Sequence, residues 1–208
     1  MTNSNKILNP GESYAALPDK ALWRKLMEGD KDALAFIYRS YFPSLFKYGM
    51  KLNPDESLVK DCIHDIFVSV WLSRERLSLT DSIKYYLLAS LKRKIASQAQ
   101  KAQPEQLFAQ ALRETAFSHS PEEALIGEQS TLELRAKLAR VMEQLPPRQK
   151  EILYLRFYEG LDTKETAAIM ELSVNSTYVL LSKALSYLKK NSDQLMIHIL
   201  IVLQVIHF

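Results

Sequence analysis

The sequence has little glycine or proline and a single cysteine. Five glycines and eight prolines in 208 residues exclude collagen-like and low-complexity chains, which are rich in both. Cys62 cannot form an internal disulfide, and the first ten residues lack the charged start and apolar stretch of a secretion signal. With 47% hydrophobic and 25% charged residues, the chain is predicted to be a globular, cytoplasmic protein of one large or two small domains.

The net charge is also small, but the basic residues are unevenly distributed along the chain. The 27 basic and 24 acidic residues give a formal net charge of +3, which by itself does not indicate a nucleic-acid partner. Residues 82–104, however, carry five basic residues and no acidic one, and residues 172–190 carry three basic residues and no acidic one. A negatively charged partner is therefore expected at these two stretches.

Apolar residues recur at intervals of three and four, so an all-α fold is predicted. One helix opens after Asp30, and Pro43 is expected to kink or break it because proline lacks a backbone donor. A second opens near Asp55 and closes at Trp71, and a third begins near Ile83. Their apolar stripes are Leu34, Ile37, Tyr38, Tyr41 and Leu45, then Leu58, Cys62, Ile66 and Val70, then Tyr86, Leu87, Leu91 and Ile95.

The pattern divides the chain into two small helical domains joined by a flexible linker. The boundaries expected are an N-terminal extension (1–29), a first domain (30–101), a linker (102–130), a second domain (131–193) and an apolar C-terminal tail (194–208). Within the tail, Leu195 to Ile206 is apolar except for His198 and Gln204, and this stretch is roughly half of the ~20 residues that a helix needs to span a bilayer. A packed terminal helix is therefore favoured for it over membrane association.

The second domain predicts a helix-turn-helix. A helix over 148–157 is expected to end at Gly160, and Asp162 or Thr163 can cap the next helix, which runs through Ile169. After a break at residues 171–173, Ser173 can cap a second helix. Its expected inward positions are Val174, Thr177, Leu181, Ala184, Leu185 and Leu188.

The outward side chains of that second helix are suited to hydrogen-bonding contacts in a DNA major groove. They are Asn175, Ser176, Tyr178, Val179, Ser182 and Lys183. In the first domain, basic and aromatic side chains are interleaved, a combination that suits unpaired strands, although a solvated helix face explains the Lys92–Lys94 run equally well. The residues concerned are Lys84, Tyr86, Lys92, Arg93 and Lys94.

The stretch from Leu145 to Lys190 reads LPPRQKEILYLRFYEGLDTKETAAIMELSVNSTYVLLSKALSYLKK and resembles domain 4 of the sigma-70 family of RNA polymerase sigma factors. Residues 30–101 resemble domain 2, with DCIHDIFVSVW (Asp61 to Trp71) in the place of the helix that binds core polymerase. With these two domains and a short linker, the chain is similar to the extracytoplasmic-function (ECF) subgroup. Glu171 stands where the family usually has a turn glycine, a change expected to cost on the order of 1 kcal/mol.

The resemblance implies a promoter-specificity subunit of bacterial RNA polymerase. Core polymerase would contact Asp61, His64 and Asp65; unstacked bases of the −10 element would meet Lys84, Tyr86, Lys92, Arg93 and Lys94; and the −35 duplex would meet the outward residues of the second helix. An anti-sigma factor, often membrane-bound, is a further partner implied for such proteins. No small-molecule substrate, cofactor, metal or catalytic residue is implied.

Other functions compete with this interpretation. The Leu145–Lys190 segment would also serve a dimeric helix-turn-helix regulator that binds its operator alone, and a purely protein-binding helical module is a third hypothesis. A metal site is disfavoured because Cys62 and His64 are two positions apart on a helix and point to different faces. An enzyme is the weakest hypothesis, since no nucleophile, phosphate loop or metal cluster is visible.

Overall fold

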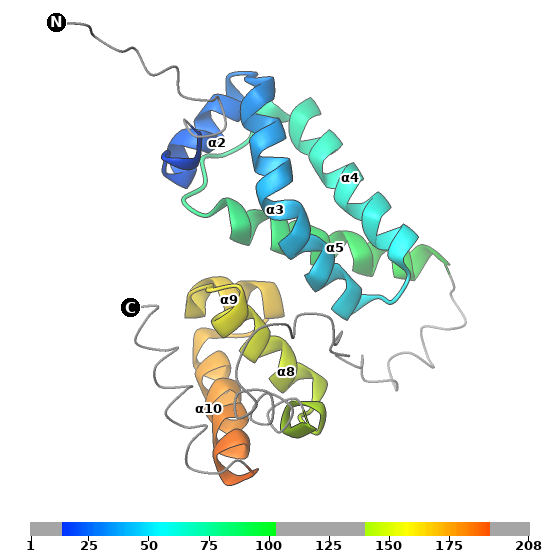
Figure 1. Ribbon diagram of the computed structural model, residues 1–208, viewed down its shortest axis with the longest axis vertical. Coiled ribbons are helices and arrows are strands. Elements are labelled where there is room, and N and C mark those ends of the chain that lie inside the picture. The colour runs from blue at the N-terminus through cyan, green and yellow to red at the C-terminus, as the bar shows by residue number, and fades with distance from the viewer. Residues whose placement is uncertain (1–13, 103–139, 192–208) are drawn as a thin grey trace, which may run out of the picture. The chain divides into compact units, whose positions relative to one another are not determined.

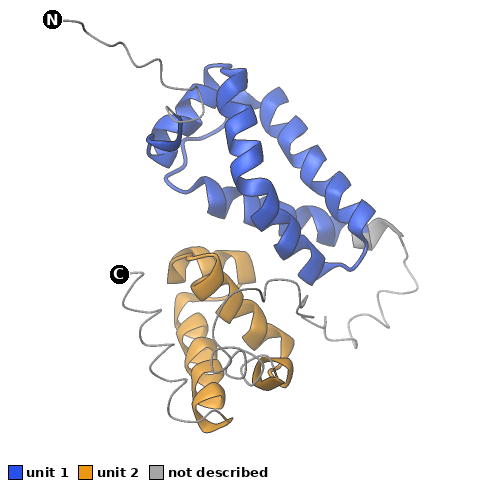
Figure 2. Ribbon diagram, viewed as in Figure 1, with its two compact units in different colours: residues 1–102 blue, residues 103–208 orange. Residues whose placement is uncertain are grey.

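The computed structural model describes residues 14–102 and 140–191, which contain helices and loops and no strand. Residues 1–102 and 103–208 form two compact units, unit 1 and unit 2 (Figure 2). The all-α, two-domain prediction is thereby confirmed. Most of the predicted linker and all of the apolar tail lie outside the described residues.

Unit 1 is built from helices that pack against one another around an apolar core (Figure 1). They are α2 (Asp19–Met27), α3 (Lys31–Leu52), α4 (Glu56–Leu72) and α5 (Ile83–Ala102), with a short 3₁₀ turn, η1 (Arg74–Arg76), between α4 and α5. Asp30 caps α3 and Asp55 caps α4, each by accepting backbone N–H groups of the first turn. Most residues of the predicted stripes are buried in this core: Ile37, Leu45, Cys62, Ile66, Val70, Leu87, Leu91 and Ile95. Tyr38 is a correction, because its side chain is 37% exposed.

Helix α2 lies in the stretch for which the sequence predicts only an N-terminal extension. The structure packs it into unit 1, where Trp23 is completely buried and donates its indole N–H to the Ser78 carbonyl at 3.0 Å. The Asp19 carboxylate accepts the Ile83 backbone N–H at 2.7 Å, so it satisfies a donor at the start of α5. Helix α2 therefore supports the segment that joins α4 to α5.

The expected break at Pro43 is wrong, because α3 continues through it to Leu52. Pro43 is exposed and leaves only one carbonyl without its helical donor, while Ile37 and Leu45 on either side are buried and hold the helix against its neighbours. Further along, Gly49 allows α3 and α4 to approach closely. A Cβ atom there would lie 2.5 Å from a methyl carbon of Val59.

Unit 2 contains α8 (Pro147–Leu153), a π-helical turn η2 (Tyr154–Tyr158), α9 (Thr163–Met170) and α10 (Val174–Asn191). Residues 140–143 are helical and this helix ends before Pro146, and Gly160, with a φ of 70°, follows the π turn. The core is formed by Leu145, Ile152, Leu155, Leu161, Ile169, Met170, Ala184 and Leu188. The helix expected over 148–157 thus includes a wider final turn, with Glu159 N–H bonded to the Tyr154 carbonyl.

Candidate nucleic-acid interface

Helices α9 and α10 form the predicted helix-turn-helix. Asp162 begins α9 with a capping box, in which its carboxylate accepts the Glu165 N–H and the Glu165 carboxylate accepts the Asp162 N–H. Glu171 adopts the left-handed conformation expected for the turn, with a φ of 55°. Ala167 is buried, and its carbonyl accepts the Leu172 N–H at 2.9 Å. The short turn therefore fixes how α10 leaves α9.

Ser173 caps α10, as its hydroxyl accepts the Ser176 N–H at 3.0 Å. Among the predicted inward residues, Thr177, Ala184 and Leu188 are buried, and Leu181 and Leu185 are half-buried. Val174 is a correction, because its side chain is 39% exposed. Val174 is the first residue of α10, and the rest of unit 2 does not cover its side chain there.

The six residues predicted to face outward on α10 are all exposed. The side chains of Tyr178 and Val179 are 57% and 48% exposed, so both are accessible to a partner. Ser176 differs from the rest, since its hydroxyl oxygen accepts a 2.8 Å hydrogen bond from the Ser173 hydroxyl. Within residues 140–191, Asn175, Ser182 and Lys183 make no hydrogen bond or ion pair.

On α4, the predicted polymerase-contacting residues Asp61, His64 and Asp65 are exposed along one stripe. The structure extends this stripe with two apolar side chains that sequence reasoning missed, Val68 and Leu72, the latter 72% exposed. The sequence did not indicate them, because apolar residues spaced by three or four positions on a helix are normally assigned to a core. The stripe therefore combines acidic and apolar groups, as protein-binding surfaces commonly do.

The basic and aromatic residues of α5 are less free than their sequence suggests. Arg93 is exposed, but Lys94 donates to the Asp65 carboxylate at 2.8 Å, and that hydrogen bond with the lysine charge holds the pKa of Asp65 below its usual value. The Tyr86 ring lies 4.9 Å from that of Trp23. Lys84 and Lys92 each interact with another residue as well.

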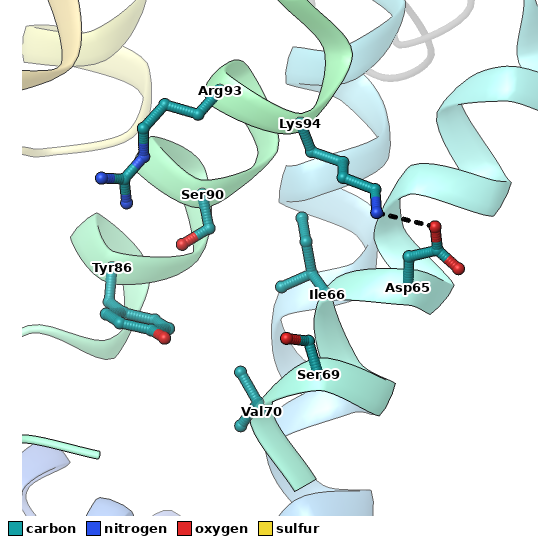
Figure 3. Close-up of a pocket in the computed structure, with 8 residues that line it drawn as sticks. All are labelled: Asp65, Ile66, Ser69, Val70, Tyr86, Ser90, Arg93 and Lys94. Carbon is teal, nitrogen blue, oxygen red and sulfur yellow. Dashed lines mark ion pairs between the residues drawn. The ribbon is translucent and has the colours of Figure 1, made fainter. Parts of the chain in front are cut away.

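A cavity of about 310 Å³ lies between α4 and α5 and joins the two predicted sets of unit 1 (Figure 3). Its lining includes Asp65 from the polymerase set and Tyr86, Arg93 and Lys94 from the −10 set, but not Lys84 or Lys92. The hydroxyl groups of Ser69 and Ser90 line it too, and sequence reasoning missed both. Ile66 and Val70 supply apolar surface beside these polar groups. The lining therefore combines charged, hydroxyl, aromatic and aliphatic groups.

The segment between α4 and α5 is held in place at several points. The Arg74 guanidinium lies 4.7 Å from the Trp71 ring and donates to the Trp71 carbonyl at 3.0 Å. Lys20 of α2 forms a 3.0 Å ion pair with Asp81. Leu79, between these anchors, is 47% exposed.

Cys62 is buried in the core of unit 1, while His64 is exposed on the other side of α4. Over residues 14–102 and 140–191, no group of three or more metal-ligating side chains comes together. No helix in this described part of the chain is both long and apolar enough to cross a membrane.

Family models match both units. Residues 37–105 match sigma-70 region 2, and residues 135–188 match sigma-70 region 4, so together the two matches cover more than half of the chain. The first match begins within α3, so α2 lies outside it. The second contains α9 and all of α10 except its last three residues. No curated protein matches the chain.

Two solved structures have similar folds. CnrH, solved in complex with the cytosolic domain of CnrY, superposes with a TM-score of 0.54 at 18% identity, covering 84% of this chain and 96% of CnrH. RpoE of Bartonella quintana, solved with the anti-sigma factor NepR, gives a TM-score of 0.52 at 18% identity, covering 74% of this chain and 92% of RpoE. At this identity the likeness concerns the fold alone.

Proposed function

Because the chain belongs to the sigma-70 family of RNA polymerase sigma factors, with the regions 2 and 4 of an ECF member, we propose which surfaces it uses to direct core polymerase to promoters. The observation that carries the proposal is the exposed outward face of α10, in a match to region 4, on the same chain as a match to region 2.

Helix α10 enters the major groove of the −35 element. Its N-terminal half presents hydrogen-bonding and small apolar side chains, and residues 172–190 contain no acidic residue that would repel phosphates. Asn175, Tyr178, Val179, Ser182 and Lys183 contact the duplex. Ser176 lies on the same face; its hydroxyl oxygen accepts from Ser173, and its own O–H remains able to donate to the duplex.

Unit 1 captures unstacked bases of the −10 element. Extruding a base from a duplex costs a few kcal/mol, so a pocket that binds the extruded base can hold the melted state without ATP. The cavity between α4 and α5 offers hydroxyl, guanidinium and aromatic groups for this purpose, at Ser69, Tyr86, Ser90 and Arg93. Lys84, Lys92 and Lys94 attract the phosphates of the opened strand.

Core polymerase binds the α4 stripe. Asp61, His64 and Asp65 provide polar contacts, and Val68 and Leu72 provide apolar area whose removal from water favours association. The protein acts in the cytoplasm, where polymerase and DNA are found. It performs no catalysis and needs no cofactor or metal, because the polymerase carries the chemistry.

An anti-sigma factor is the proposed inhibitor. Both solved structures that support the fold contain a second protein: the cytosolic domain of CnrY on CnrH, and the anti-sigma factor NepR on RpoE. The exposed apolar residues of α4 offer this chain a comparable surface for a protein partner. Contact with a membrane arises only through such a factor.

A stand-alone dimeric regulator is the alternative. It would need a dimerisation or ligand domain in the first hundred residues, and there the chain matches sigma-70 region 2 instead. Run-off transcription with bacterial core polymerase separates the two functions. A sigma factor starts transcripts at a discrete promoter only when core polymerase is present. Specific operator binding by the protein alone, with no effect on core polymerase, would contradict the proposal.

Two matched substitutions sharpen this assay. Lys183→Ala is expected to reduce initiation at the mapped promoter, whereas Lys189→Ala, the same change on an exposed residue nearer the end of α10, leaves it nearly unchanged. Arg93→Ala is compared in the same way with Arg24→Ala, an exposed arginine of α2. Permanganate footprinting of the opened strand reports the Arg93 effect separately from −35 binding.

A further inference from the structure

The first two turns of α10 expose an amide and an aliphatic side chain one helical turn apart. Asn175 and Val179 are both exposed, and four residues of an α-helix span about 6 Å. Successive bases on one strand are about 3.4 Å apart along the duplex axis. The two side chains are therefore spaced to reach base pairs that lie about two steps apart.

Each of these side chains has a preferred partner in the major groove. An asparagine amide donates to N7 and accepts from the N6 amino group of adenine in a bidentate pair, and an aliphatic side chain packs against the C5-methyl group of thymine. Guanine is read by arginine or lysine. Residues 172–191 contain no arginine, and the first lysine, Lys183, comes two turns after Asn175.

The intervening residues do not compete for these roles. The Ser176 hydroxyl oxygen accepts from Ser173, and Thr177 is buried, with its hydroxyl donating to the Ser173 carbonyl at 3.0 Å. Tyr178 is exposed but is a large side chain, suited to the flank of the groove. Asn175, in contrast, makes no hydrogen bond within residues 140–191, so its amide is available in full.

We propose that α10 selects A·T pairs, with Asn175 reading an adenine and Val179 reading a thymine methyl about two base pairs away. This proposal rests on the function assigned to α10 above and adds the base sequence it prefers. Specificity at these two positions comes from one bidentate pair and one apolar contact, and not from a guanine-reading basic residue.

The first test selects −35 sequences from a randomised library with the holoenzyme, formed from core polymerase and the full chain. Adenine and thymine are expected at two positions about two steps apart. Asn175→Arg should change the selected adenine to guanine and leave the thymine position unaltered. Selection of guanine by the unaltered protein at either position would overturn the proposal.

The second test changes single atoms of the DNA. Replacing the selected thymine with uracil removes one methyl group and should weaken holoenzyme binding by about fourfold, the factor for burying one such group. Replacing the adenine with 7-deazaadenine removes the N7 acceptor and should weaken binding by about fivefold or more. Fluorescence anisotropy at fixed salt measures both changes.

Crossed variants identify which side chain is responsible. Val179→Ser should lose sensitivity to uracil but keep sensitivity to 7-deazaadenine, and Asn175→Ala should do the reverse. Both residues are exposed, so circular dichroism should show intact folding. If the unaltered holoenzyme requires the −35 element but ignores both base changes, this inference fails while the proposed function stands. If it does not require the −35 element at all, the proposed function of α10 fails as well.

Discussion

The candidate DNA surfaces of the two units differ in how far their side chains are already engaged. On α10, the outward groups Asn175, Ser182 and Lys183 have no polar partner within residues 140–191. On α5, Lys94 is paired with Asp65 and Tyr86 packs on Trp23. Under the proposed function, unit 2 would present a prepared surface for an intact duplex, whereas unit 1 would have to exchange internal contacts for new ones on binding an opened strand.

The largest loss of stability, which tests how far unit 1 depends on its internal contacts, is expected from Trp23→Ala. The substitution removes the buried ring beneath Tyr86 and the hydrogen bond to Ser78, so unit 1 should lose about 3–5 kcal/mol of stability. The sequence has two tryptophans, and the other, Trp71, also lies in unit 1, so its fluorescence in a urea titration reports the loss. Tyr178→Ala, at an exposed site of unit 2, should change stability by no more than about 0.5 kcal/mol.

The next effect concerns unit 2. Ala167→Leu forces a larger side chain into the buried position beside the turn and should destabilise the helix-turn-helix by about 1–3 kcal/mol. Hydrogen exchange of the α9 and α10 amides measures the loss, with the α3 amides of unit 1 as an internal control. Unchanged protection in α9 and α10 would mean that the turn tolerates a wider separation of its helices.

A smaller effect, of opposite sign, is expected from Glu171→Gly. Glycine accepts the left-handed conformation of this residue without strain, so the change should stabilise unit 2 by up to about 1 kcal/mol. Ala168→Gly, inside α9 and also exposed, should instead destabilise it by about 1 kcal/mol. Hydrogen exchange of the same amides distinguishes the two; equal destabilisation would show that the turn carries no strain.

The smallest effect on stability is expected from Asp65→Asn, because both members of the ion pair with Lys94 are substantially exposed; the loss should be below about 1 kcal/mol. The pKa of Asp65 is lowered, so the pair's contribution is present above the ordinary carboxyl pKa and is lost as pH falls through the lowered value. An NMR titration should show the pKa of Asp65 returning toward its ordinary value in Lys94→Met. If it stays low there, the ion pair is not its cause.

The sequence predicts the helices that have strong periodicity and a capping residue. Asp55 and Ser173 begin α4 and α10 as expected, and Glu171 takes the left-handed conformation. These features depend on residues within one turn of each other, so they are readable locally. The six outward residues of α10 are exposed for the same reason: one helical period determines which face they share.

Features that depend on distant packing could not be predicted. Helix α2 is short, and its contacts with Ser78 and Ile83 join residues more than fifty positions apart. Pro43 is tolerated because buried neighbours hold α3 on both sides. The cavity between α4 and α5 depends on which faces of two helices meet, so Ser69 and Ser90 carry no signal in the sequence that marks them as its lining.

Helix α2 also determines which residues of the segment between α4 and α5 can vary in sequence. It holds that segment through Trp23 at Ser78, Lys20 at Asp81 and Asp19 at Ile83. Between these anchors, Leu79 is exposed and supports no core. Substitution of Leu79 is therefore expected to leave unit 1 folded, so this position of the segment can vary while the anchored scaffold stays the same.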